Sequence, residues 1–409
     1  MPRSLTPAVF ALALAGPAFA QEGGETEIPR FPRDANVSAS PAQPAGVEES
    51  VAEVGGFDIE VSGYVRVHYQ SIFEDPDQTP DVGRNDGFAM DAARLIVRAM
   101  KGPLEGYVSI DGAVDRFESV DSTRGRVEVG LKDAYVGYAR EDFPWLKLRL
   151  GQFKPPFDAE ELQSTREILF TDRAVESRGL RSTEGDALDG LSLDREVGAM
   201  VYGDPTFGAF GLGYYVAVSN GSGANRPLND NDALAYTGRL ELRFEEIAAL
   251  GGAVNFNRRT TGDLIEDQVD EERMTIAADL RAHVDLQVVG LIVQAQFMQR
   301  TSSFPDVDVQ PDRVEQGWHA ALGVEVPYGF VIAYRYATLD PWADYDIDDG
   351  TVGEDLDNRA VTHHTIGLNW SGGDAMPLKA QLNYTIATEE DEARPLDNDR
   401  VDALVQVSF

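Results

Sequence analysis

The sequence predicts an all-β fold, a transmembrane antiparallel β-barrel of about sixteen strands whose long third outer loop folds into the lumen. Three observations predict this class. From Phe57 onward, apolar and polar residues alternate along the chain with the two-residue period of a strand. The connections between the alternating segments are short and long in turn. No apolar run approaches the roughly 18 residues of a membrane-spanning helix, so only a closed barrel could carry this chain across a membrane.

The composition excludes several classes of function. The 409 residues include 70 acids against 35 bases, which gives a formal net charge of −35, and they include no cysteine. The acid excess argues against nucleic acid as a partner, because nucleic-acid binders present a basic surface. Without cysteine the chain has neither a disulfide framework nor a thiolate metal site.

The N-terminal part is expected to lie outside the barrel. Residues 1–20 have the pattern of a secretory signal peptide, with Arg3 as the basic start and Ala18-Phe19-Ala20 as an A-x-A cleavage site. The alternative is a buried first helix, but the apolar stretch is short and ends in small residues. Residues 21–56 are rich in Pro, Ala, Gly and Glu without periodicity, which predicts a flexible periplasmic leader. Residues 57–409 form the predicted outer-membrane barrel.

The alternation predicts the strands in order along the chain. In each segment one face is apolar and the other carries polar or charged residues, except in the Gly-rich segment 207–218, whose polarity the pattern does not assign. An even number of strands is typical of single-chain bacterial outer-membrane barrels. The expected strands cover residues 57–70, 94–99, 108–115, 126–132, 146–151, 197–201, 207–218, 236–244, 250–259, 274–283, 289–300, 318–325, 332–336, 363–370, 378–386 and 401–409.

The connections separate a barrel from other β folds. Short periplasmic turns and long outer loops are typical of a transmembrane barrel, whereas a sandwich or solenoid has no reason to alternate them. Short turns are expected at 102–103, 141–144, 203–205, 245–246, near 285, at 327–328 and at 372–377. Long polar loops are expected at 74–86, 117–125, 154–189, 220–231, 260–272, 301–312, 340–358 and 389–399.

The third of these long loops follows a strand that places Leu148 on one face and Arg149 on the other. The Lys154-Pro155-Pro156 run ends that strand, because proline cannot donate to the strand ladder and restrains the residue before it. Asp158 is placed to cap a short helix. Loops longer than about 15 residues are uncommon unless functional or disordered. We therefore expect this loop to fold into the lumen and to set its bore.

Several motifs lie in and around this loop: GQFKPPF at Gly151–Phe157, Ile168-Leu169-Phe170, Asp172-Arg173, Arg178, Leu131–Gly137 and Arg195–Gly198. On these motifs the chain from Phe57 to Phe409 resembles the phosphate-selective porins, types O and P. The resemblance implies a trimeric barrel of about sixteen strands with the third outer loop folded inward. It also implies a lining of arginine and lysine that attracts phosphate or pyrophosphate.

The faces assigned to the lumen carry more bases than acids, although the whole chain is acidic. A basic constriction raises the local concentration of anions, and arginine binds phosphate through two parallel hydrogen bonds. The alternative is that these bases pair with lumen acids and brace the wall. No clear ladder of bases on adjacent strands is visible, so phosphate is one candidate solute among small anions. The residues expected to line the pore and bind anions are Arg94, Arg98, Lys132, Arg149, Lys154, Arg166, Arg173 and Arg178.

Other motifs are weaker. The acidic run Asp344–Gly350 has oxygen ligands at alternate positions, as a calcium loop has, but its glycine is one place late and Asp355 stands where glutamate is expected. A solvated acidic loop is the simpler interpretation, with loosely bound Ca²⁺ or Mg²⁺ bridging to lipopolysaccharide as its alternative. His363 and His364 lie on opposite strand faces and cannot share a metal. No G-x-S-x-G motif is present, so we expect no enzyme.

We therefore expect a passive diffusion channel for small anions in the bacterial outer membrane, a homotrimer in contact with membrane lipid and lipopolysaccharide. Two alternatives stay open. One is a general or cation-preferring porin, because the outer loops are acidic. The other is a non-channel barrel that serves as an adhesin or envelope anchor. The sign of ion selectivity separates the first alternative, and absence of conductance after reconstitution would support the second.

Overall fold

The structure, a computed structural model, describes residues 52–73, 82–83, 86–112, 114–115, 126–127, 129–140, 142–185, 187–226, 228–261, 269–305, 312–344, 360–373, 376–389, 396 and 398–409. The predicted signal peptide and nearly all of the predicted leader lie outside these residues, as does the calcium-like motif after Asp344. Among the helices in the described ranges, none has the length and apolarity needed to cross a bilayer.

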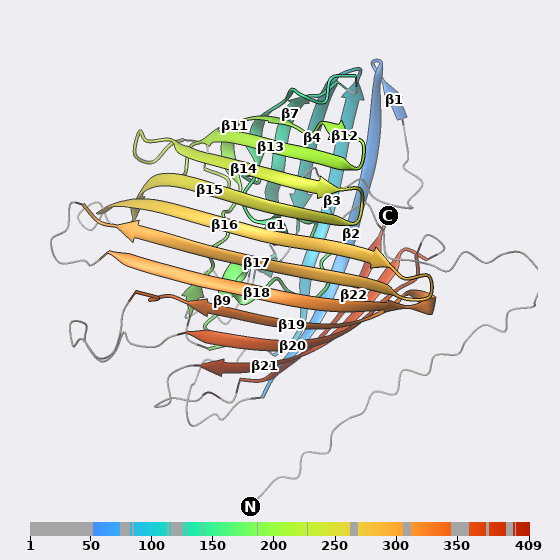
Figure 1. Ribbon diagram of the computed structural model, residues 1–409, viewed down its shortest axis with the longest axis vertical. Coiled ribbons are helices and arrows are strands. Elements are labelled where there is room, and N and C mark those ends of the chain that lie inside the picture. The colour runs from blue at the N-terminus through green and yellow to red at the C-terminus, as the bar shows by residue number, and fades with distance from the viewer. Residues whose placement is uncertain are drawn as a thin grey trace, which may run out of the picture.

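Antiparallel strands close on themselves to form a barrel (Figure 1). The main sheet has 18 strands, and without the short hairpin extensions β1 (Ala52–Val54) and β12 (Thr206–Phe207) sixteen of them make the wall. The first wall strand, β2 (Phe57–Ile72), pairs with the last, β22 (Arg400–Ser408), and this pairing closes the barrel. The predicted sixteen-stranded antiparallel barrel is confirmed.

Between these two, the wall strands follow one another in the order of the chain. They are β3 (Gly87–Lys101), β4 (Leu104–Asp111), β7 (Gly130–Tyr138), β8 (Lys147–Phe153), β11 (Glu196–Gly203), β13 (Phe210–Ser219), β14 (Ala235–Phe244), β15 (Ala248–Thr261), β16 (Val269–Asp285), β17 (Gly290–Ser303), β18 (Arg313–Val326), β19 (Phe330–Asp340), β20 (Val361–Ser371) and β21 (Leu378–Glu389). The remaining short elements are β5 (Val114–Asp115), β6 (Arg126–Val127), α1 (Ala159–Leu162), α2 (Val175–Arg178), β9 (Gly179–Leu180), β10 (Leu188–Asp189) and η3 (Pro327–Gly329).

The connections alternate as the sequence predicts. At one end of the barrel, Gly102-Pro103 joins β3 to β4, residues 245–247 join β14 to β15, and η3 joins β18 to β19. At the other end, residues 154–195 connect β8 to β11 and residues 220–234 connect β13 to β14. Because a hairpin turn leaves no chain to cover a pore, any constriction has to come from the end with the long connections.

The fourth wall strand differs from the expected one. The alternation places a strand over 126–132, whereas β7 begins at Gly130. A bulge between Ser109 and Ile110 of β4 leaves Lys132 without a partner in the ladder. The extra residue shifts the alternation by one place, so Asp133 rather than Lys132 faces Ser109. Sequence periodicity alone cannot locate such a bulge, because the bulge depends on the paired strand.

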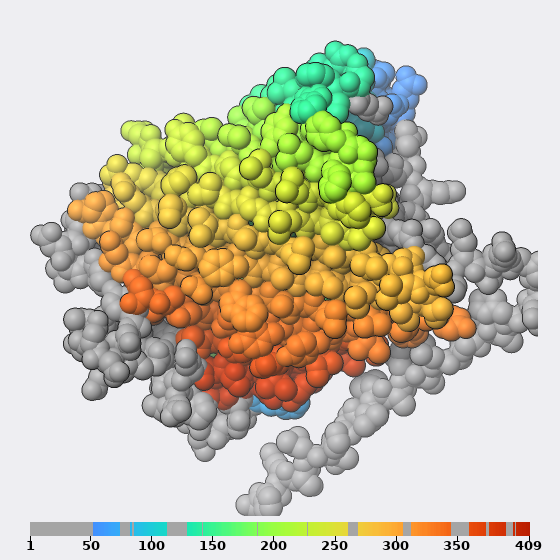
Figure 2. Space-filling view, viewed as in Figure 1, coloured from blue at the N-terminus to red at the C-terminus, as the bar shows by residue number. Residues whose placement is uncertain are grey.

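The two faces of the wall have opposite chemistry. Apolar side chains point outward, such as Leu240, which is 62% exposed, and the side chains of β13 to β19 form one continuous outer surface (Figure 2). Charged residues point inward and are buried, as Arg66 and Arg239 are. The Gly-rich strand β13 follows the same rule, since Val216 is 59% exposed and its neighbour Tyr215 only 2%. This pattern is that of a barrel with an apolar exterior and a polar lumen.

The connection between β8 and β11 lies against inward-facing side chains of the wall. Its helix α1 begins as predicted, because the Asp158 carboxylate accepts hydrogen bonds from the backbone N–H groups of Glu160 (2.8 Å) and Glu161 (3.1 Å). Further along, Arg66 of β2 donates to the Thr171 carbonyl at 2.8 Å, and Lys379 of β21 donates to the Ile168 carbonyl at 2.7 Å. Wall side chains thus satisfy the backbone carbonyls of this connection, which would otherwise be buried without partners.

An apolar contact adds to these hydrogen bonds. Leu169 and Phe170 pack with four buried wall residues. Those residues are Ile292, Ala321, Val331 and Ala333, from strands β17 to β19. The guanidinium carbon of Arg335 also lies 4.4 Å from the centre of the Phe170 ring. The connection is therefore held by apolar, polar and cation–π contacts on strands that lie far apart around the barrel.

Candidate functional site

A cavity of about 130 Å³ lies between this connection and the wall strands that precede and follow it. Its lining contains more bases than acids. The bases are Arg94, Arg98, Arg149, Lys154, Arg166 and Arg195. The acids are Glu60, Glu105 and Asp133. Five of the eight residues that the sequence predicts for anion binding therefore share one cavity, in a chain whose formal net charge is −35.

Two of the wall arginines are paired with acids on the next strand. The guanidinium of Arg94 on β3 donates to Asp111 Oδ2 through Nε (3.2 Å) and Nη2 (2.8 Å). Arg98, four residues further along β3, donates to Glu105 Oε1 at 2.7 Å. Such ion pairs orient the guanidinium groups and partly neutralise the positive charge that a solute would meet. Part of the predicted basic lining therefore also stabilises the wall by linking neighbouring strands.

Lys154 stands where the connection leaves β8 and lies 3.0 Å from Glu161 Oε1. Arg173 binds the same carboxylate from the other side, with its Nε 2.8 Å from Glu161 Oε2. Burial lowers the pKa of Lys154 to about 8; Glu161 opposes this shift, whereas Arg173 adds to it. The two bases outweigh burial at Glu161 and lower its pKa to about 2. The cluster therefore carries two bases for one acid at neutral pH.

Arg166 and Lys132 lie at different places relative to the cavity. Arg166 lines the cavity and holds Glu167 through a contact of 3.3 Å between Nε and Oε1. Lys132 is half-buried at the bulge of β7, and its backbone carbonyl accepts a hydrogen bond of 2.8 Å from Gln152. Lys132 is not among the residues that line the cavity, and the bulge leaves it without a ladder partner on β4.

Arg149 is the central base of the cavity wall. Its side chain is 9% exposed, and its guanidinium carbon lies 4.2 Å from the ring centre of Tyr135 and 5.5 Å from that of Tyr202. Within the described part of the chain, no carboxylate lies within 4 Å of its guanidinium nitrogens. Aromatic faces rather than acids therefore stabilise this charge.

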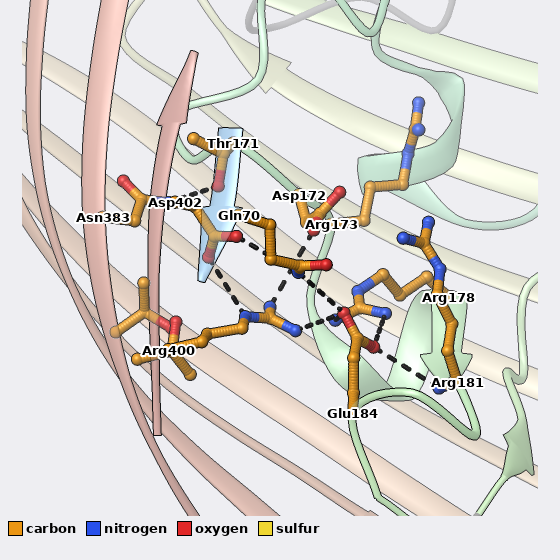
Figure 3. Close-up of polar contacts among 12 residues, drawn as sticks. Gln70, Thr171, Asp172, Arg173, Arg178, Arg181, Glu184, Asn383, Arg400 and Asp402 are labelled. Carbon is orange, nitrogen blue, oxygen red and sulfur yellow. Dashed lines mark hydrogen bonds and ion pairs between the residues drawn. The ribbon is translucent and has the colours of Figure 1, made fainter. Parts of the chain in front are cut away.

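Arg178 lies outside the cavity, in a buried network of ion pairs (Figure 3). Both of its terminal nitrogens donate to Glu184, at 2.7 and 3.2 Å. Arg400 of β22 binds Glu184 as well, and its Nε lies 3.1 Å from Asp402 Oδ2. Burial disfavours the charged form of Glu184, but Arg178, Arg400 and Arg181 hold its pKa well below the usual range. This network joins the connection to the seam where β22 meets β2.

One cluster has the residue types of a metal site. Glu160, Glu176 and His319 are buried and offer ligand atoms within 4.8 Å of one another. The His319 imidazole hydrogen-bonds Glu176, and Arg335 lies 3.2 Å from Glu160. Burial raises the pKa of Glu176, and His319 opposes that shift. The positive charges of Arg335 and of a protonated His319 would balance the negative charges of Glu160 and Glu176. The cluster is then neutral without a metal ion.

The comparisons with known proteins agree with this geometry. A family model described as Gram-negative porin matches residues 7–385. The chain belongs to the Gram-negative porin family. This porin is therefore a protein of the bacterial outer membrane, and its family and fold are those of channels. The family match does not distinguish the phosphate-selective types O and P from other Gram-negative porins.

Solved structures support the fold of this porin. The outer membrane channel DcaP of Acinetobacter baumannii matches with a TM-score of 0.57 and 16% identity, over 90% of this chain and 100% of that one. An anion-selective porin from Comamonas acidovorans matches with a TM-score of 0.53 and 14% identity, over 86% of this chain and 100% of that one. OmpT of Vibrio cholerae in its trimer form matches with a TM-score of 0.51 and 9% identity, over 87% of this chain and 100% of that one. No curated protein sequence matches the chain.

A second cavity of this porin, about 480 Å³, lies toward the end with the long connections. Its bases are Arg226, Arg259, Arg273 and Arg300, and its acids are Asp189, Asp194 and Glu196. Three of these bases lie on the adjacent strands β15, β16 and β17. The alternation within single strands does not show this row of bases, because strand register decides which residues come side by side. Arg195 was missed as well, since it precedes β11 and belongs to no alternating run.

Proposed function

We propose that this porin is a passive diffusion channel that prefers small anions. The observation that carries the proposal is the 130 Å³ cavity, where six bases face three acids although acids outnumber bases twofold in the chain. Three of the carboxylates that pair with these bases do not line the cavity, so the lining that a solute meets is basic; these are Asp111, Glu161 and Glu167. A basic lining between low-dielectric walls raises the local concentration of anions. Solute would enter through the larger outer cavity, pass the connection between β8 and β11, which constricts the lumen, and leave through the basic cavity.

Two neighbours support parts of this proposal. The Comamonas acidovorans structure carries the description of an anion-selective porin, and that of Vibrio cholerae OmpT includes a trimer form. We propose a homotrimer that contacts lipid and lipopolysaccharide, with small anions as its solutes. Phosphate or pyrophosphate is the finer proposal, favoured by the sequence motifs around Gly151–Phe157 and by the bidentate geometry that arginine offers.

The deciding experiment is the reversal potential of the purified protein in planar bilayers under a KCl gradient, repeated with added phosphate. Anion selectivity supports the proposed function, and block of the chloride current by phosphate supports the phosphate proposal. Cation selectivity would favour a general or cation-preferring porin, which would agree with the acidic composition of the outer loops. Absence of conductance in reconstituted, folded protein would favour a non-channel barrel.

Neutralising three bases of the cavity should remove most of the selectivity. In the triple variant Arg149→Gln, Lys154→Gln, Arg166→Gln, three bases remain against three acids. We expect the chloride-to-potassium permeability ratio to fall by about tenfold, because the local field no longer favours anions. Arg258→Gln is the control, since Arg258 pairs with Asp270 and is 47% exposed. An unchanged ratio in the triple variant would show that selectivity arises elsewhere.

Selectivity should also depend on pH through Lys154. Its pKa is lowered to about 8 by burial, so the ammonium is charged below that pH and neutral above it. The chloride-to-potassium permeability ratio should therefore decrease as the pH rises through about 8. In Lys154→Arg the guanidinium stays charged over this range and the ratio should stay flat. A variant that keeps the wild-type pH dependence would assign the titration to another group.

A further inference from the structure

Four tyrosines and one arginine form a row across five neighbouring wall strands. Tyr107 of β4 stacks on Tyr135 of β7, with ring centres 4.9 Å apart and planes at 8°. Tyr202 of β11 stacks on Tyr215 of β13 at 5.9 Å and 10°. Arg149 lies on β8, between these two pairs, near the faces of Tyr135 and Tyr202. The guanidinium is thus flanked by an aromatic ring from each neighbouring strand.

Arg149 differs from the other bases of the 130 Å³ cavity. Each of the other five lies within 4 Å of a carboxylate, in the pairs Arg94–Asp111, Arg98–Glu105, Lys154–Glu161, Arg166–Glu167 and Arg195–Asp133. Within the described residues, Arg149 has no such partner, and its Nε is buried without a hydrogen bond. The rings hold the charge in place but leave its donors unused.

Another unused donor beside Arg149 is the Tyr135 hydroxyl, and a second tyrosine hydroxyl is unused elsewhere in the cavity. The hydroxyl groups of Tyr135 and Tyr215 are buried and have no hydrogen-bond partner in the described structure, and both residues line the same cavity. Their side chains are 6% and 2% exposed. Buried polar groups are nearly always paired with protein or with ordered water. A solute that accepts hydrogen bonds and carries negative charge would pair with the Arg149 guanidinium and the Tyr135 hydroxyl together.

We propose that Arg149 determines the solute specificity of this porin by binding a planar carboxylate group, assisted by the hydroxyl group of Tyr135. The inference rests on the proposed anion channel and names the class of solute. A carboxylate and a guanidinium pair in one plane through two parallel hydrogen bonds. The rings of Tyr135 and Tyr202 lie beside the Arg149 guanidinium, and such neighbours favour a flat partner in the guanidinium plane. A chloride ion has no pair of coplanar acceptor atoms. Phosphate can also offer two oxygens to the guanidinium, but its remaining oxygens lie outside that plane, on the sides where the rings are.

The test compares acetate with chloride in planar bilayers of the full-length protein. Wild-type conductance should saturate in potassium acetate at lower concentration than in potassium chloride, which gives an apparent dissociation constant for acetate. In Arg149→Lys the charge remains but the planar pair of donors is lost. We expect the apparent dissociation constant for acetate to rise about tenfold, while the selectivity in chloride changes less. Arg258→Lys, an outward-facing substitution, should leave both unchanged.

A second variant guards against misfolding. Tyr135→Leu leaves Arg149 in place but removes one ring and one hydroxyl, and it should weaken acetate binding in the same direction. Wild-type saturation by acetate in Arg149→Lys, or a wild type that conducts acetate and chloride alike, would overturn the inference. If phosphate binds more tightly than acetate, and this binding is lost in Arg149→Lys, the proposal that the solute is a planar carboxylate would be overturned. A cation-selective wild type would overturn the proposed function itself, which the chloride measurement reports separately.

Discussion

Replacing Glu184 by glutamine is expected to release the connection between β8 and β11 from the barrel wall without unfolding the barrel. Glu184 is 3% exposed and accepts hydrogen bonds from Arg178 and Arg400, which lie on different elements. Removing one member of a buried ion network leaves the opposite charges uncompensated and costs about 3–5 kcal/mol. The wall ladders do not include Glu184, so they should persist.

Limited proteolysis with trypsin measures this effect, because Arg178 and Arg181 lie beside the released contact. We expect rapid cleavage there in Glu184→Gln, together with larger and noisier single-channel currents. Asp142→Asn is the control: its pair with Arg140 is solvent-exposed, and exposed pairs contribute little. Wild-type resistance to trypsin in Glu184→Gln would show that apolar and backbone contacts hold the connection without the network.

Replacing Gly317 by alanine is expected to displace helix α2 from β18. A Cβ at this position would lie 2.3 Å from Glu176 Cβ and 2.7 Å from the Thr338 carbonyl oxygen, so the helix or the strand would have to move. Overpacking of a close contact costs about 1–3 kcal/mol. The nearby contact between His319 and Glu176 should weaken as well, because α2 carries Glu176.

Thermal unfolding and single-channel conductance test this prediction. The variant should unfold at lower temperature and show a changed conductance, since α2 belongs to the connection that we propose as the constriction of the pore. Gly252→Ala is the matched control on β15, where the nearest atom to an added Cβ is 3.8 Å away. Equal behaviour of the two variants would mean that α2 adapts to the methyl group at little cost.

The barrel and the direction of its side chains follow from local patterns. A two-residue period assigns each strand residue to one of two faces, so Arg94 and Arg149 could be placed in the lumen without knowledge of their neighbours. The turns follow from the spacing of polar residues between strands. The start of α1 could be predicted too, because Asp158 caps it through hydrogen bonds within the same few residues.

The partners of each basic residue could be assigned only from the tertiary structure. Arg178 enters an ion network and Arg149 faces aromatic rings, although the chain presents both simply as basic residues near one loop. Arg178 shares Glu184 with Arg400, which lies more than two hundred positions away, and Tyr202 faces Arg149 only through the register of β8 with β11. Lys132 has no ladder partner because it is the extra residue of a bulge, which appears only in the register of β7 against β4. Local periodicity determines which face a residue occupies, whereas register and loop docking determine which charges meet, and these depend on contacts between distant parts of the chain.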